Sequence, residues 1–240
     1  MPYIVCLDPG HGPGTVNGSP DGTYKEREFA WDMYERLAPL LAKNGIQVVC
    51  TRTQETKPSL GERCRISNNT GADLFVSLHS NAAGSSGWAE PKGLMIYTHK
   101  AGDTASQNMA AQCVLKRVKE ENIELFGSGL AHYGYTVLTN TYAPAILIEY
   151  GFHTSRVDAE NLKLYAYRDV LARATAKGVM DFLGVAYQEE DREEGVEAPS
   201  PWHKDAWEKA CSKGIFDGTS PQGAATREMM ATVLDRLELL

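Results

Sequence analysis

Short apolar runs that alternate with longer amphipathic stretches constrain the fold of this chain more than any other feature. Runs such as YIVCL and AILI are rich in β-branched residues, a composition typical of strands, whereas apolar residues spaced three or four apart predict helices. The predicted strands are 3–7, 46–51, 73–78, 93–98, 135–138 and 145–148; the predicted helices are 26–45, 59–69, 103–122 and 164–183. This alternation predicts an α/β fold with a largely parallel central sheet and flanking helices.

A change in composition divides the 240-residue chain near its end. Residues 188–197 (QEEDREEGVE) carry six acidic residues and one arginine, too much charge for a packed segment. We therefore expect a catalytic domain at 1–185, an acidic linker at 186–198 and a small helical domain at 199–240. Some 40 residues is near the lower limit for independent folding, so we expect the last part to dock on something.

Charge and hydropathy exclude several classes of function. The net charge is −7, whereas a nucleic-acid interface is normally basic, so we expect no nucleic-acid partner. No apolar run approaches the roughly 18–20 residues that span a bilayer, so we expect no membrane insertion. The start of the chain lacks the features of a signal peptide, which predicts synthesis in the cytoplasm without one. The five cysteines form no CxxC motif and are expected to be reduced.

Ionisable residues follow three of the predicted strands. His11 lies in the turn DPGHG after the first strand, His79 follows the strand at 73–78, and Glu149 follows the strand at 145–148. Because ligands bind beyond the carboxyl ends of parallel strands, we expect these side chains to converge at one rim, where Glu26 opens the first helix. Two imidazoles and a carboxylate are the ligands of a catalytic zinc, and a further carboxylate can act as general base.

Other interpretations of these residues remain open at this stage. A lone histidine is often only a hydrogen-bonded structural residue, and Glu26 can stabilise the helix dipole at the start of its helix. Glu28 is an alternative to Glu26 as a ligand. Arg52 and Arg63 are predicted to be structural ion-pair partners.

Four ordered motifs carry a resemblance to a known family. DPGHG at 8–12, KERE at 25–28, SLHSNA at 77–82 and ILIEYGFHTS at 146–155 resemble the zinc-dependent N-acetylmuramoyl-L-alanine amidases of the cell-wall hydrolase type, over roughly residues 1–184. The resemblance implies a doubly wound fold around a mixed sheet and one Zn²⁺ held by His11, Glu26 and His79. It also implies that Glu149 is the catalytic carboxylate. His153 stands where the family usually has an apolar or small residue.

The resemblance implies a peptidoglycan hydrolase. Its substrate bond is the amide between N-acetylmuramic acid and the L-alanine of the stem peptide, attacked by zinc-activated water. Asn81 and His153 are candidate substrate contacts. Two alternatives are a zinc peptidase acting on stem peptides and a non-catalytic protein that binds the cell wall.

The last 40 residues have a resemblance of their own. The spacing of Trp, Ala and Gly-Ile, followed by Asp-Gly and Thr-Arg-Glu, looks like part of an S-layer-homology wall-binding repeat. It implies attachment to a secondary wall polymer, or formation of a homo-oligomer. Together with the predicted catalytic domain, this tail suggests a phage endolysin that reaches the cell wall through holin pores.

Overall fold

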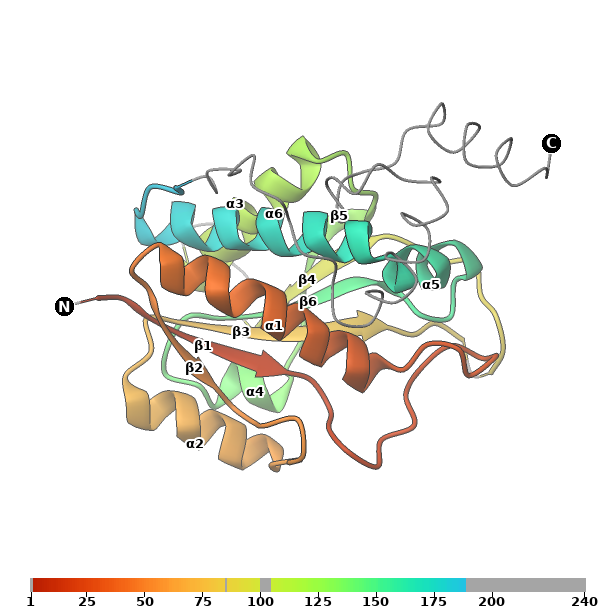
Figure 1. Ribbon diagram of the computed structural model, residues 1–240, viewed down its shortest axis with the longest axis horizontal. Helices are drawn as coiled ribbons and strands as arrows, with labels where there is room; N and C mark the ends of the chain where they lie inside the picture. The colour runs from red at the N-terminus through yellow and green to blue at the C-terminus, as the bar shows by residue number, and fades with distance from the viewer. Residues whose placement is uncertain (1, 85, 100–104, 189–240) are drawn as a thin grey trace, which may run out of the picture. The chain divides into compact units, whose positions relative to one another are not determined.

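The computed structural model describes residues 2–84, 86–99 and 105–188 of the chain. Strands in this part form one sheet in the order β2-β1-β3-β6-β4-β5 (Figure 1). The strands are β1 (Ile4–Pro9), β2 (Gln47–Cys50), β3 (Leu74–Asn81), β4 (Leu94–Thr98), β5 (Leu125–His132) and β6 (Ala145–Phe152). The helices are α1 (Glu26–Lys43), α2 (Leu60–Thr70), α3 (Ser106–Glu120), α4 (Thr136–Thr139), α5 (Arg156–Lys163) and α6 (Tyr165–Leu183).

The sheet is mixed, with parallel pairing over most of its width. β1 pairs in parallel with β2 and β3, β3 with β6, and β4 with β5. β4 runs antiparallel to β6. The predicted α/β fold with a largely parallel sheet is confirmed. The predicted helical domain at 199–240 and most of the predicted linker lie outside the described residues.

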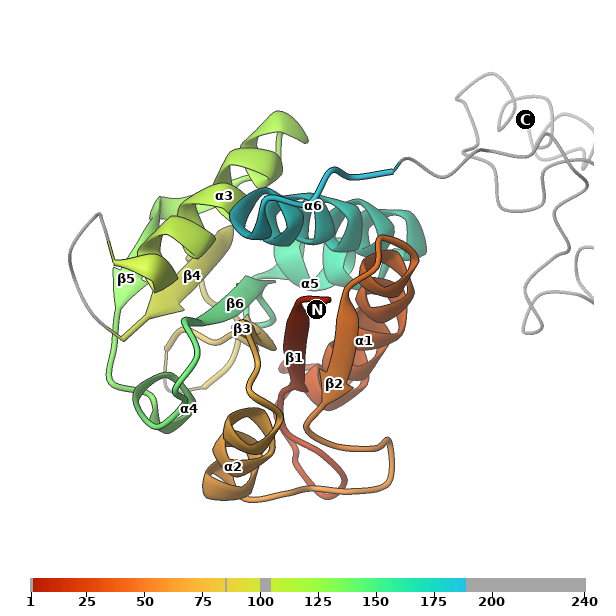
Figure 2. The same ribbon diagram turned by 90° about the vertical axis from the view of Figure 1, so that its left-hand side faces the viewer.

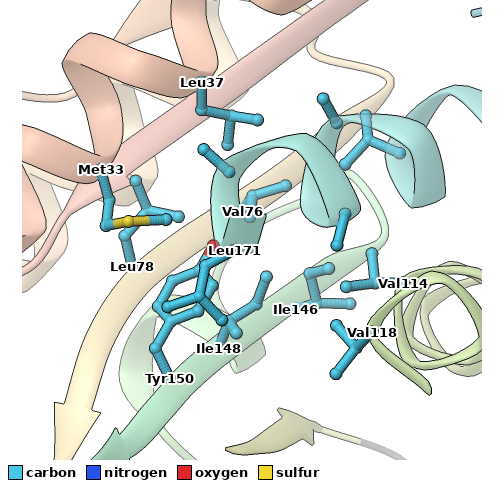
Figure 3. Packing of buried hydrophobic residues seen from close by; sticks show 14 of the residues in the cluster. Met33, Leu37, Val76, Leu78, Val114, Val118, Ile146, Ile148, Tyr150 and Leu171 are labelled. Atoms are coloured by element: carbon cyan, nitrogen blue, oxygen red, sulfur yellow. The ribbon is translucent and has the colours of Figure 1, made fainter. Parts of the chain in front are cut away.

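Helices cover both faces of the sheet. Figure 2 shows α1, α3 and α6 on one face and α2 and α4 on the other. The α1, α3 and α6 face holds the larger apolar cluster, in which Val76, Leu78, Ile146 and Ile148 are fully buried against side chains such as Met33 (Figure 3). Because side chains alternate along a strand, the residues between them face α2 and α4.

A smaller apolar cluster lies on that second face. Cys6, Phe75 and Leu147 pack there against Cys64 of α2 and Val137 of α4. The same alternation continues along β1, β3 and β6 to Asp8, Ser77, His79 and Glu149, so the polar residues of all three strands share this face.

Local signals explain the ends of several elements. α2 begins with the predicted capping box, in which the Ser59 hydroxyl and the Glu62 carboxylate each bond the other residue's backbone N–H. β6 was predicted to end before Glu149, which is wrong. The strand continues to Phe152, whose N–H donates to the buried carboxylate of Asp158 at 2.7 Å.

Two other predictions of secondary structure fail. Residues 135–138 were predicted to be a strand, but Thr136–Thr139 form the short helix α4, in which Val137 and Leu138 are buried. β5 was not predicted, because its glycines, Gly127 and Gly129, hide the alternation that marks a strand. None of the helices in the described part of the chain is both long and apolar enough to cross a membrane.

Candidate metal centre

Asp8 anchors the turn that leads into the site. Its carboxylate is almost fully buried and accepts hydrogen bonds from the hydroxyls of Thr51 at 2.5 Å and Ser77 at 2.7 Å. It also forms a 2.7 Å ion pair with Arg63, which confirms the predicted structural role of that arginine. Charge-assisted bonds of this kind are short and strong, so the end of β1 is held rigidly.

Two arginines hold the backbone of the turn that follows. Arg52 donates to the carbonyls of Pro9 at 2.8 Å and Gly10 at 3.3 Å, and Arg63 donates to those of Pro9 and His11. An ion pair was predicted for Arg52, but in the described residues its hydrogen bonds go to backbone oxygens. His11 has a φ of 60°, which is uncommon for a residue other than glycine, and these bonds stabilise it.

The side chain of His79 packs directly on the backbone of Gly10. A Cβ at position 10 would lie 2.2 Å from the His79 ring, so only glycine fits there. This close approach brings the rings of His11 and His79 to a centroid distance of 4.9 Å, with an edge-to-face angle of 75°.

Glu26 lies between the two histidines. Its Oε2 is 2.9 Å from Nε2 of His11, and its Oε1 is 2.9 Å from Nδ1 of His79. The peptide N–H of Ser80 donates to the same Oε1 at 3.1 Å, so the carboxylate is positioned from β3. One donor atom from each of the three side chains lies within 4.8 Å of the others. The structure therefore brings together the three residues that were predicted as ligands.

Glu28, the alternative ligand, lies apart from this cluster. Its side chain is 59% exposed, and its Oε1 pairs with Nζ of Lys25 at 3.1 Å. The acidic group that joins the two histidines is Glu26, at the first position of α1.

The charges of the cluster stabilise one another. Burial would raise the pKa of Glu26, but hydrogen bonds and charges from His11 and His79 outweigh it and hold that pKa well below its usual range. Burial would lower the pKa of His79, but the hydrogen bond and charge of Glu26 raise it to about 9. Because an imidazole must lose its proton to bind a metal, a divalent cation at these three atoms would displace the proton of His79.

Glu149 lies beside the cluster on β6, in register with His79 of β3. It is buried, and its Oε2 has no hydrogen-bond partner among the described residues. Burial raises the pKa of Glu149 to about 8, against the opposing charge of His79. A carboxyl group with a free oxygen and a pKa near neutrality is suited to accept and return a proton.

One cleft of about 620 Å³ joins these groups. Its lining includes all six residues predicted for the site, namely His11, Glu26, His79, Asn81, Glu149 and His153. Residues 57–60 at the start of α2 and 134–137 at the start of α4 also line it. The cleft lies at the carboxyl ends of β1, β3 and β6, where the sequence predicted convergence.

Sequence reasoning missed the hydroxyl groups behind the ligands. The hydroxyl of Tyr24 donates to Oγ of Ser80 at 2.8 Å, and this Oγ is 3.0 Å from Nδ1 of His153. Ser80 lies between two predicted site residues in the motif LHSN, which was the available signal. A serine in a strand carries no pattern that identifies its partner, so the connection depends on the fold.

The chain belongs to the N-acetylmuramoyl-L-alanine amidase family, whose sequence model matches residues 5–181. The N-acetylmuramoyl-L-alanine amidase LytC of Bacillus subtilis (strain 168) is 29% identical over 178 residues, which are 74% of this chain and 35% of LytC. The endolysin of Bacillus phage SPP1 is 28% identical over 193 residues, which are 77% of this chain and 68% of the endolysin. This chain therefore matches only about a third of the length of LytC.

A solved structure agrees with this membership. The crystal structure of an N-acetylmuramoyl-L-alanine amidase from Clostridium difficile 630 has a TM-score of 0.69 and 30% sequence identity, covering 76% of this chain and 97% of that chain. The similarity spans the mixed sheet and its flanking helices, so the fold is that of the amidases.

Proposed function

We propose that this chain is a zinc-dependent peptidoglycan amidase. In this proposal it hydrolyses the amide bond between N-acetylmuramic acid and the L-alanine of the stem peptide. The observation that carries the proposal is the cluster of His11, Glu26 and His79, with the free Oε2 of Glu149 in the same cleft. Membership of the amidase family supports the choice of bond.

The donor set fits zinc. Two imidazole nitrogens and one carboxylate oxygen are the three protein ligands of many catalytic zinc sites, and here they are near enough to bind one ion. When bound, zinc supplies a Lewis acid that polarises a carbonyl and makes water more acidic. His11, Glu26 and His79 would hold it, with the carboxylate oriented by the Ser80 N–H.

Glu149 moves the proton in this mechanism. A cation in the cleft favours its ionised form, so Oε2 can accept a proton from the water that attacks the amide carbonyl. The carbon–nitrogen bond then breaks as the protonated Glu149 gives that proton to the leaving L-alanine nitrogen. The products are a free lactyl carboxyl group on the sugar and a free amine on the peptide.

Asn81 and His153 are the proposed substrate contacts. The side-chain oxygen of Asn81 accepts from the N–H of Ala82 at 2.8 Å, which leaves its amide nitrogen for a ligand. The backbone of His153 is tied to the same loop, because its N–H donates to the carbonyl of Asn81 at 2.8 Å.

The test is the release of new amino termini from purified Gram-positive peptidoglycan. We expect new N-terminal alanine and no new reducing sugar, with loss of activity in Glu149→Gln and in chelated protein, and recovery on adding zinc. Activity that survives both treatments contradicts the mechanism. New termini within the stem peptide would favour a zinc peptidase, and wall binding without cleavage would favour a binding protein.

We also propose that the enzyme serves phage-mediated lysis of the host, made in the cytoplasm and released through holin pores. Similarity to an endolysin of phage SPP1 supports this role. Expression in a Gram-positive host should cause lysis only when a holin is co-expressed. Lysis without the holin would contradict this route.

We propose that residues 199–240, which lie outside the described residues, attach the enzyme to a secondary wall polymer, with a homo-oligomer as the alternative. The sequence resemblance of the tail supports this. Full-length chain should sediment with intact walls and much less with walls whose polymer was removed by acid extraction. Equal sedimentation would contradict polymer binding, and the mass in solution would then test the oligomer.

A further inference from the structure

His153 follows the last residue of β6 and is fixed from several sides. It is 4% exposed, and its ring stacks on that of Tyr24 with a centroid distance of 6.0 Å and an interplanar angle of 23°. Its Nδ1 is 3.0 Å from the hydroxyl of Ser80, which also accepts a hydrogen bond from the hydroxyl of Tyr24. The ring therefore ends a buried chain of three polar groups.

The hydroxyl hydrogens of Tyr24 and Ser80 determine which nitrogen of the His153 ring is protonated. Tyr24 and Ser80 each bring one hydroxyl hydrogen, and both find an acceptor only if Tyr24 donates to Ser80 and Ser80 donates to Nδ1 of His153. A hydrogen on Nδ1 would leave one hydroxyl hydrogen without an acceptor in this buried chain, which costs about 1–3 kcal/mol. Nδ1 is therefore the acceptor.

A neutral ring then carries its hydrogen on Nε2. Burial lowers the pKa of His153, and this outweighs the opposing influence of the Glu26 charge and the Ser80 backbone. A neutral imidazole has one donor and one acceptor nitrogen, so fixing Nδ1 as acceptor makes Nε2–H the donor. The hydrogen bond between this ring and the Ser80 hydroxyl is made through Nδ1, and the residue lines the cleft with Glu149.

We propose that Nε2–H of His153 donates a hydrogen bond to an amide carbonyl oxygen of the substrate in the cleft, an inference that rests on the proposed amidase function. The acceptor is an uncharged carbonyl. A neutral imidazole N–H offers no positive charge to pair with a carboxylate, whereas the N-acetyl and peptide groups of a muropeptide offer neutral carbonyl oxygens that accept its hydrogen bond. The Tyr24–Ser80 pair acts by holding the ring in this tautomer.

Two substitutions separate this role from a merely structural one. In His153→Asn, the side-chain oxygen can still accept from Ser80 in place of Nδ1, but nothing replaces Nε2–H. In His153→Gln, the amide nitrogen reaches the place of Nε2 and can donate, but Ser80 loses its acceptor. The first keeps the structural bond and loses the proposed one, and the second does the reverse.

The experiment measures kcat/KM on a soluble muropeptide, zinc content and thermal midpoint for the full-length wild type and both variants. We expect His153→Asn to lose about fivefold to tenfold in kcat/KM with an unchanged midpoint, and His153→Gln to keep activity within about twofold with a lower midpoint. Full activity in His153→Asn, or equal losses in both variants, would overturn the proposal.

The imidazole ¹⁵N resonances test the tautomer without any turnover. We expect an unprotonated Nδ1 and a protonated Nε2 in the wild type, and the opposite assignment would overturn the proposal. An inactive wild type would instead refute the proposed amidase function. An active wild type with the reverse order of variants refutes the role of His153 alone.

Discussion

Along β6, Ile146, Ile148 and Tyr150 lie in the large apolar core, whereas Leu147 and Glu149 lie on the opposite face of the sheet. The same strand thus delivers its even-numbered residues to packing and an odd-numbered one to the cleft. β3 repeats the pattern, with Leu74, Val76 and Leu78 in the core and His79 at the site. The two faces differ in chemistry because side chains alternate, and a shift of one residue in register would exchange them.

The helices that cover the two faces of the sheet also differ in length. The core face is covered by α1, α3 and α6, each at least 15 residues long, whereas the opposite face is covered by α2 with 11 residues and α4 with four. The shorter cover leaves the carboxyl ends of β1, β3 and β6 open, and the cleft occupies that end. The core face is therefore buried and rigid, whereas the opposite face leaves room for a ligand to enter the cleft.

The largest expected effect is a loss of activity when a residue on the cleft face of the sheet is changed. Glu149→Gln removes the proton-carrying group and keeps its shape, so kcat should fall by about 10²- to 10⁴-fold. Zinc content and thermal midpoint show whether the site and fold survive, and we expect both to be retained. A variant with more than about a tenth of wild-type activity would show that Glu149 is not the base.

A matched change on the core face should act on stability instead. Ile146 is fully buried, and Ile146→Ala should lower the free energy of unfolding by about 2–5 kcal/mol, through lost transfer energy and the cavity left behind. Denaturant titration measures this, and kcat/KM below the unfolding transition should stay near that of the wild type. A large loss of kcat/KM in folded protein would show that the two faces are not separate in function.

Metal binding should stabilise the cleft face through the ligands alone. Zinc at about 100 times its Kd should raise the free energy of unfolding by about 2.7 kcal/mol, because it binds the folded state. Glu26→Gln should lose most of this gain and Glu28→Gln should keep it, since only Glu26 contacts both histidines. Calorimetric titration and thermal shift measure both, and an equal loss in the two variants would contradict the ligand assignment.

The sequence predicted the ionisable residues of the cleft better than the residues that hold them in place. His11, His79 and Glu149 each follow or end an apolar run, so their convergence at one rim could be inferred from strand order. The clamp formed by Arg52 and Arg63 could not, because backbone carbonyls carry no sequence signal for their partners. The fit of His79 against Gly10 depends in the same way on a distance between two strands.

The fold was predictable where the patterns are regular and failed where they are short or hidden. Residues 135–138 include Val137 and Leu138, but four residues carry no period that separates a strand from a helix turn. β5 lies at the edge of the sheet, where glycine and serine are tolerated on an exposed strand. Neither error moved the site, because the predicted rim depends on β1, β3 and β6.

A further expected effect is the pH dependence of stability in the metal-free protein. The pKa of Glu149 is raised to about 8 from 4.5, so between these values the folded state keeps a proton that the unfolded state has lost. Stability then falls as pH rises through this window, by up to about 1.4 kcal/mol per pH unit, and is unaffected by this group below pH 4.5.

Glu149→Gln removes this dependence, so in chelated protein the stability of the variant relative to the wild type should increase from pH 5 to pH 8. Denaturant midpoints at each pH measure it, and saturating zinc should reduce the difference because a nearby cation favours ionised Glu149. Parallel curves for the two chelated proteins would show that Glu149 is solvated in the cleft and that burial does not raise its pKa.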